Sequence, residues 1–190
     1  VLHGSANPMF ILHPGATLGA TDNTEKASAI KEVILPLDGS IIGEQVLAHA
    51  VPLIKALGLT ARLIRVTPNP VDYYNYMPGY LMEGGSPAYY GGIEEYSGVV
   101  DAEALEYLGN VKERLQREGV LSVEESLLYG PAAAAIVDAV QQAPDSIIAM
   151  TTHGRSGIGR WVLGSVAERV VGNSERPVLL IRAVETEADI

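Results

Sequence analysis

Residues 146 to 171 contain three consecutive runs, SIIAM, TTHGRSGIGRWVLG and SVAERVV. The first has the length and apolar character of a buried strand, and the last begins like a helix. Glycines between Gly154 and Gly164 allow the backbone to approach a ligand closely. The first N–H groups of a helix lack intrahelical acceptors and favour an anion. The segment therefore predicts a strand–loop–helix unit that binds a phosphate group.

The same alternation extends outward along the chain. It predicts strands at residues 33–37, 60–67, 120–128, 146–150 and 177–181, and helices at 41–57, 99–118, 131–142 and 165–171. Pro52 is expected to kink the first helix. Alternating strands and helices favour a doubly wound, Rossmann-like α/β fold with a five-stranded parallel sheet covered on both faces. Ligands bind at the carboxyl ends of such strands, where Asp38 and the loop from Thr151 both lie.

Composition narrows the class of protein further. An apolar content of 47% over 190 residues is enough for one domain with extensions. The net charge of -10 opposes sequence-independent binding to nucleic acid. No apolar run approaches the roughly 20 residues of a membrane span. The absence of cysteine excludes disulfides and thiolate metal sites and fits a cytoplasmic location. His3, His13 and His49 lack metal-ligand spacing.

Residues 68–98 interrupt the pattern with several prolines, glycines and tyrosines. Such a composition predicts an insertion without regular secondary structure. Tyrosine supplies rigid, amphipathic contact area, so a lid or an interface with another protein is one interpretation. A partly ordered surface loop is the other.

The first fourteen residues, VLHGSANPMFILHP, resemble residues 170–183, VVGNSERPVLLIRA. The two segments share a serine, a proline (Pro8 and Pro177) and the four apolar residues that follow it. We interpret residues 1–14 as the tail of a preceding similar domain and 15–31 as a linker. Residues 9–12 are then expected to form a strand beside residues 178–181 of the same or another chain. Chance similarity of two short apolar runs is the alternative.

Five short segments resemble the universal stress protein family: PLDGS at 36–40, GPAAAAI at 130–136, THGRSG at 152–157, GSVAERV at 164–170 and RPVLLIR at 176–182. The family signature is a glycine, two residues, a glycine, nine residues and Gly-Ser or Gly-Thr. Gly154, Gly164 and Ser165 match its longer half, whereas its first glycine falls on Thr151. The resemblance implies a domain over residues 32–183 with an adenine nucleotide alpha hydrolase-like fold, and a flexible tail over 184–190.

The resemblance also implies a site for ATP, AMP or ADP, with Mg²⁺ accompanying the nucleotide. Asp38 is expected near the ribose or adenine, Val66 beside the adenine and Met150 at the edge of the base. The phosphates are expected to be received by Gly154, Gly164, Ser165 and Val166. The full expected site comprises Pro36, Asp38, Val66, Met150, Thr151, His153, Gly154, Arg155, Gly157, Gly164, Ser165 and Val166. The implied role is regulation in a stress response, through an unidentified protein partner, a homodimer or a tandem domain, with last strands adjacent across a two-fold axis.

Other interpretations of single residues stay open at this point. Asp38 is also suited to capping the following helix. His153 is more simply a residue that orients the loop than a general base, because no catalytic partner accompanies it. Arg155 and Arg160 are either phosphate ligands or solvated surface residues. Thr151, being β-branched, is expected to weaken or alter nucleotide binding.

The sequence favours a regulatory protein over an enzyme. Slow ATP hydrolysis or phosphoryl transfer is disfavoured because the GxxxxGK[ST] phosphate loop is absent. A protein-interaction module that does not use nucleotide is the remaining alternative.

Overall fold

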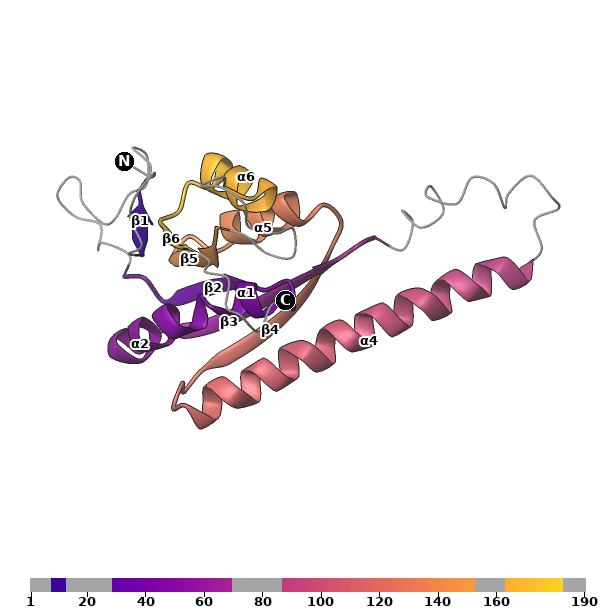
Figure 1. Cartoon of the computed structure of the whole chain (residues 1–190), viewed down its shortest axis with the longest axis horizontal. Helices are drawn as coiled ribbons and strands as arrows, with labels where there is room; N and C mark the ends of the chain where they lie inside the picture. Colours follow the sequence, from indigo (N-terminus) through magenta and orange to yellow (C-terminus); the bar gives the residue numbers. More distant parts are fainter. Residues whose placement is uncertain (1–7, 13–28, 70–86, 153–162, 183–190) are drawn as a thin grey trace.

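Five parallel strands form the centre of the fold (Figure 1). The structure is a computed structural model, and it describes residues 8–12, 29–69, 87–152 and 163–182. The strand order is β1-β6-β5-β2-β3-β4. The parallel strands are β2 (Glu32–Pro36), β3 (Thr60–Thr67), β4 (Val123–Tyr129), β5 (Ser146–Thr151) and β6 (Val178–Ile181). Strands β3 and β4 follow on one side of β2, and β5 and β6 lie on its other side. The topological switch point is therefore between β2 and β5.

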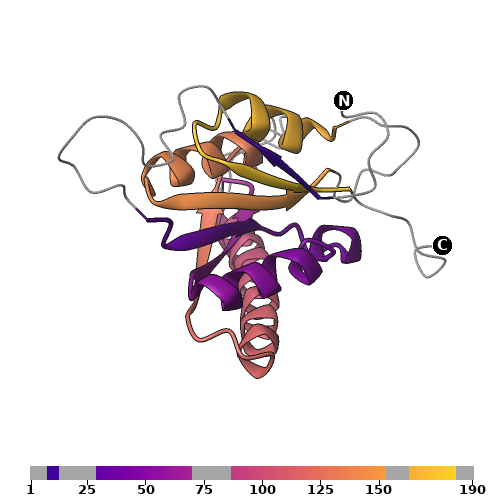
Figure 2. The same ribbon diagram turned by 90° about the vertical axis from the view of Figure 1, so that its left-hand side faces the viewer.

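Helices cover both faces of this sheet, as Figure 2 shows. On one face lie α1 (Ile41–Glu44), α2 (Leu47–Leu57) and α4 (Pro87–Arg117), and on the other lie α5 (Ala132–Gln141) and α6 (Ser165–Asn173). Each layer has its own cluster of buried side chains, because alternate residues of a strand point to opposite faces. The predicted doubly wound α/β fold is confirmed.

The helix expected over residues 41–57 is two helices in the structure. The amide of Gln45 donates to Ile42 O at 3.2 Å and that of His49 to Val46 O at 3.1 Å. These bonds span three residues, so the chain tightens between α1 and α2. Pro52 lies inside α2, and the kink expected there stays a prediction. The break before α2 was not predicted.

Helix α4 corrects the expectation for residues 68–98. It begins at Pro87, well before the expected start at Val99, and is 31 residues long, or roughly 46 Å at about 1.5 Å per residue. A proline is tolerated in the first turn, and a glycine costs only about 1 kcal/mol in a helix that is already formed. The prediction of no regular structure is therefore wrong for residues 87–98, while residues 70–86 lie outside the described residues. In Figure 1 the first half of α4 projects beyond the sheet.

A carboxylate near the middle of α4 fixes the helix to the sheet. Asp101 accepts hydrogen bonds from Thr67 Oγ1 at 3.2 Å and from Tyr129 OH at 2.8 Å. Thr67 ends β3 and Tyr129 ends β4. From this point to its C-terminus, α4 packs on the sheet through Leu108, Val111 and other buried residues.

The sixth strand, β1 (Met9–Ile11), runs antiparallel to β6 at the edge of the sheet. Residues 9–11 pair with residues 178–180 of the same chain, which confirms the expected strand except at Leu12, which lies beyond its end. The proposed origin of β1 in a preceding domain stays a prediction. No helix among the described residues has both the length and the apolar character needed to cross a membrane.

Candidate functional site

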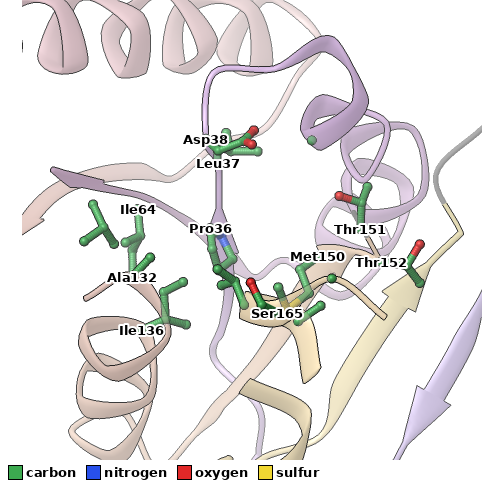
Figure 3. Close-up of a pocket in the computed structure, with 15 residues that line it drawn as sticks. Pro36, Leu37, Asp38, Ile64, Ala132, Ile136, Met150, Thr151, Thr152 and Ser165 are labelled. Carbon is green, nitrogen blue, oxygen red and sulfur yellow. The ribbon is translucent and has the colours of Figure 1, made fainter. Parts of the chain in front are cut away.

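A cavity of about 280 Å³ opens at the carboxyl ends of β2, β3 and β5 (Figure 3). The two segments predicted to meet there, the turn at Asp38 and the end of β5 with the start of α6, both line it. Their meeting follows from the topology, because β2 and β5 are adjacent parallel strands and both end at this edge.

One wall of the cavity is apolar. It consists of Ile64 and Val66 from β3, Ile136 from α5 and Met150 from β5. These side chains belong to or pack against the core cluster beneath α5 and α6, so the surrounding structure holds them in place. An apolar wall of this kind suits the flat face of an aromatic base.

The N-terminus of α6 also lines the cavity, with Ser165 beside Met150 (Figure 3). Gly164 is the N-cap, with φ -60° and ψ 150°, and no side chain caps the helix. Its own N–H donates to Thr152 O at 2.7 Å. The donors without intrahelical acceptors are therefore those of Ser165, Val166 and Ala167, which all line the cavity. The helix end offers these N–H groups, with its positive dipole end, to an anion.

The carboxylate of Asp38 is held by the turn that follows it. Asp38 Oδ1 accepts from Ser40 N at 3.0 Å and from Ser40 Oγ at 2.6 Å, while Ser40 Oγ accepts from Gly43 N at 2.9 Å. Ser40, and not Asp38, is thus the N-cap of α1. Asp38 supports the start of the helix through Ser40, and its side chain lines the cavity.

Gly43 lies against this carboxylate. A Cβ atom built on Gly43 would be 2.6 Å from Asp38 Oδ1 and 3.1 Å from Ser40 Oγ. Real Cβ atoms do not approach oxygen so closely, so any side chain at residue 43 must displace Asp38. No pattern in the sequence predicted Gly43 as part of the site.

Behind Asp38, on the face covered by α1 and α4, lies a charged cluster. Glu44 pairs with Arg114 at 2.5 Å, and the guanidinium of Arg65 lies 5.4 Å from the centre of the Tyr107 ring. Burial, and then the charge of Glu44, raise the pKa of Tyr107 above its usual value, so its hydroxyl stays protonated at alkaline pH as well. This cluster braces α1, and with it the turn at Asp38, against α4.

Thr151, at the position of the first glycine of the signature, is the last residue of β5. It is 7% exposed, pairs with Ile181 and lines the cavity. Extended backbone suits a β-branched residue, so the substitution causes no backbone strain here. Its effect is to put a methyl and a hydroxyl group where the signature has no side chain.

Of the expected site residues, the structure brings together Pro36, Asp38, Val66, Met150, Thr151, Gly164, Ser165 and Val166 around the cavity. His153, Gly154, Arg155 and Gly157 lie outside the described residues. The structure adds Ile64, Ala132, Ile136, Thr152 and Ala167, among others. Ile64 could have been predicted from the sequence, because side chains two residues apart in a strand point to the same face, so Ile64 lies on the same face of β3 as Val66. The described residues contain no group of three or more acidic, histidine or cysteine side chains able to hold a metal ion.

Residues 29–182 match the model of the universal stress protein family, so the chain belongs to that family. It is 31% identical to Universal stress protein MJ0531 of Methanocaldococcus jannaschii over 157 residues, which cover 83% of this chain and 85% of that protein. A universal stress protein of Thermus aquaticus is 32% identical over 155 residues, which cover 80% of this chain and 98% of the relative.

Solved structures show the same fold. Protein MJ0577 superposes with a TM-score of 0.65 at 22% identity, covering 83% of this chain and 99% of its own. A universal stress protein solved in complex with cAMP gives a TM-score of 0.56 at 18% identity, covering 83% and 100%. A universal stress protein of Archaeoglobus fulgidus gives 0.57 at 20% identity, where 97% of this chain matches 53% of that one.

Proposed function

We propose that this chain binds ATP, or the related nucleotides AMP and ADP, and acts as a regulator in a stress response. Binding alters its pairing with a second domain or a protein partner, and the chain turns over little or no nucleotide. The observation that carries the proposal is the cavity itself, which is lined both by an apolar wall and by the first residues of α6. The relative solved with cAMP supports an adenine nucleotide as the ligand. We also propose a cytoplasmic location for this chain, which the absence of cysteine from its sequence fits.

In the proposed complex, each part of the nucleotide has a partner in the cavity. The base packs against Val66 and Met150, a ribose hydroxyl donates to Asp38, and the phosphates accept from the N–H groups at the start of α6. The Ser165 hydroxyl is a neutral oxygen of the kind that Mg²⁺ accepts beside phosphate oxygens. In this proposal the Mg²⁺ enters with the nucleotide, bound to its phosphate oxygens.

Calorimetric titration of the nucleotide-free chain with ATP and Mg²⁺ tests the proposal, and two substitutions of Ser165 sharpen it. Ser165→Pro removes one N–H at the first helical position, where proline is tolerated, and Gly164 before it is already extended. We expect this variant to weaken ATP binding by about tenfold, the cost of one charge-assisted hydrogen bond. Ser165→Ala keeps the N–H and separates the contribution of the hydroxyl.

Adenosine is the matched control ligand, because it lacks phosphate and should bind the unmodified chain and the Ser165→Pro variant equally. A folded chain that takes up no adenine nucleotide would refute the proposal and favour a protein-interaction module that does not use nucleotide. An equal loss of ATP and adenosine binding would show that the substitution distorts the cavity as a whole.

Thr151→Gly should strengthen ATP binding. Removing the side chain enlarges the cavity where the family signature has a glycine, and we expect a gain of roughly 3- to 10-fold in affinity, or about 1 kcal/mol. The same change should destabilise the fold by about 1 kcal/mol, because glycine weakens a strand. Thr60→Gly, at the far end of the sheet, controls for that loss. A weaker affinity in the Thr151→Gly variant would show that the threonine hydroxyl is a ligand contact and not an obstacle.

A further inference from the structure

Strand β4 forms one edge of the sheet, and its outer side is open among the described residues. It pairs with β3 and is the last strand in the sheet order. The amide of Ala61 donates to Ser122 O, and the amide of Gly130 donates to Thr67 O, each at 2.9 Å. Backbone groups alternate between the two sides of a strand, so the even-numbered residues of β4 bond to β3. The odd-numbered residues, 123, 125, 127 and 129, therefore direct their N–H and C=O groups outward.

Little in the sequence of β4 protects this edge. Natural edge strands are usually very short, or carry charges or proline that discourage pairing. Strand β4 is seven residues long and contains no proline. Of its odd-numbered residues only Glu125 is charged, and Lys112 Nζ of α4 lies 3.8 Å from its carboxylate. The second half of the strand, from Ser126 to Tyr129, carries no charge and leaves the edge able to accept another strand.

Helix α4 reaches beyond β4 and adds apolar surface beside the open edge. Asp101 accepts from Tyr129 at the end of β4, and Lys112 pairs with Glu125 near its start, so α4 runs antiparallel along β4 (Figure 1). Leu105 lies one turn after Asp101, in the same row of the helix. Leu105 is 46% exposed and Tyr129 is 47% exposed. A strand added to β4 would cover both side chains.

We propose that the β4 edge binds an extended segment of a partner protein, in which apolar and basic residues alternate. Main-chain hydrogen bonds to the odd-numbered residues of β4 hold the segment, as in other cases of strand addition. Its apolar side chains pack against Leu105 and Tyr129 on the α4 side. Its basic side chains lie beside the exposed Glu124 on the other side, and the net charge of -10 attracts them.

This surface is separate from the nucleotide site. The described residues that line the cavity include none from β4 or α4. The proposal therefore goes beyond the proposed function and does not depend on nucleotide binding.

Hydrogen exchange measured by NMR tests whether the edge is open. In the unmodified chain, the amides of residues 123, 125, 127 and 129 should exchange at least tenfold faster than those of 124, 126 and 128, which bond to β3. An added peptide that binds as proposed should slow the first set several-fold and leave the second unchanged. Protection of the odd-numbered amides in the free chain would show that the edge is already covered, and would overturn the proposal.

The probe is a fluorescent synthetic peptide of alternating lysine and valine, as long as β4 at seven residues. It should bind the unmodified chain saturably below about 1 mM, and several-fold more weakly when the salt concentration is raised tenfold. One control peptide has glutamate in place of lysine, and another has methyl groups on alternate backbone nitrogens, which cannot donate hydrogen bonds. Both should bind at least tenfold more weakly. Equal binding by either control, or no binding of the probe, would overturn the proposal.

Two substitutions of Leu127 separate the backbone of β4 from its side chains. Leu127→Pro removes an outward N–H group, and proline is tolerated at such a position of an edge strand. Leu127→Ala loses the same side chain but keeps the N–H group. The proline variant should bind the probe at least tenfold more weakly than the alanine variant. Equal affinities would contradict strand addition. If Leu127→Pro does not fold, the methylated peptide makes the same test on the unmodified chain.

A second copy of the chain is the competing occupant of this edge. Sedimentation of the unmodified chain and of both Leu127 variants at about 100 µM distinguishes the two cases. The three proteins should have the same mass, because the proposed partner is a different protein. A dimer that Leu127→Pro dissociates and Leu127→Ala leaves intact would show that β4 pairs with its own copy, and the proposal would then be wrong.

Discussion

Replacing Gly43 with alanine should weaken ATP binding by about 10- to 100-fold, the range expected for loss of a hydrogen bond to a charged group. The new Cβ would lie 2.6 Å from Asp38 Oδ1. The carboxylate must then rotate and give up its bonds from Ser40 N and Ser40 Oγ. It no longer points where the proposed function needs an acceptor for the ribose.

The effect on stability separates this mechanism from general damage. Alanine is favoured over glycine in a helix by about 1 kcal/mol, so a Gly→Ala change in open space should stabilise the protein. Gly109, in α4, has no atom within 4 Å of its added Cβ. Gly109→Ala is therefore the matched control: it should raise the unfolding temperature and leave the affinity for ATP unchanged.

Titration calorimetry and thermal unfolding of both variants distinguish displacement of Asp38 from general damage to the fold. Gly43→Ala should stay folded, with stability close to that of the unmodified chain, because the gain in helix propensity offsets part of the strain at Asp38. If Gly43→Ala binds ATP as well as Gly109→Ala does, Asp38 does not contact the nucleotide. The remaining cavity contacts would then have to account for binding.

The periodic spacing of apolar residues, and the glycines and prolines between the periodic segments, were sufficient to predict most of the sheet. Residues 60–67 alternate between the two core clusters and form β3 over the predicted range. Ser165 begins α6 as expected, because the helix starts directly after a glycine that is extended at the N-cap. The short apolar run after Pro8 correctly predicted an edge strand, since its likeness to residues 178–181 supplied a partner.

The rest depends on local hydrogen bonds and tertiary contacts that leave little trace in the sequence. The break between α1 and α2 follows from local hydrogen bonds at Gln45 and Val46, neither of which is a helix breaker. The early start of α4 was hidden by glycines that a formed helix tolerates. Likewise, Gly43 is ordinary in sequence. Only the approach of its backbone to Asp38 shows that a side chain does not fit there.

Leu108→Ala should lower the free energy of unfolding by about 2 to 5 kcal/mol. Leu108 is 0% exposed and packs, from α4, into the cluster of buried side chains on the α1, α2 and α4 face of the sheet. Truncation leaves a cavity that a rigid sheet cannot close. Leu105, in the preceding turn of the same helix, is 46% exposed, so Leu105→Ala should cost less than about 1 kcal/mol. Denaturant unfolding of the two variants measures the difference.

Despite this loss, the folded Leu108→Ala variant should bind ATP with an affinity within about twofold of the unmodified chain, since sites without shared partners behave nearly independently. The apolar wall of the cavity, including Ile64 and Met150, belongs to the cluster beneath α5 and α6, on the other face of the sheet. Titration at low temperature, where the variant is folded, tests this. A large loss of affinity would show that the sheet transmits the change from one core to the other, through neighbours such as Leu63 and Ile64 on β3. In that case α4 would act on the nucleotide site and not only on stability.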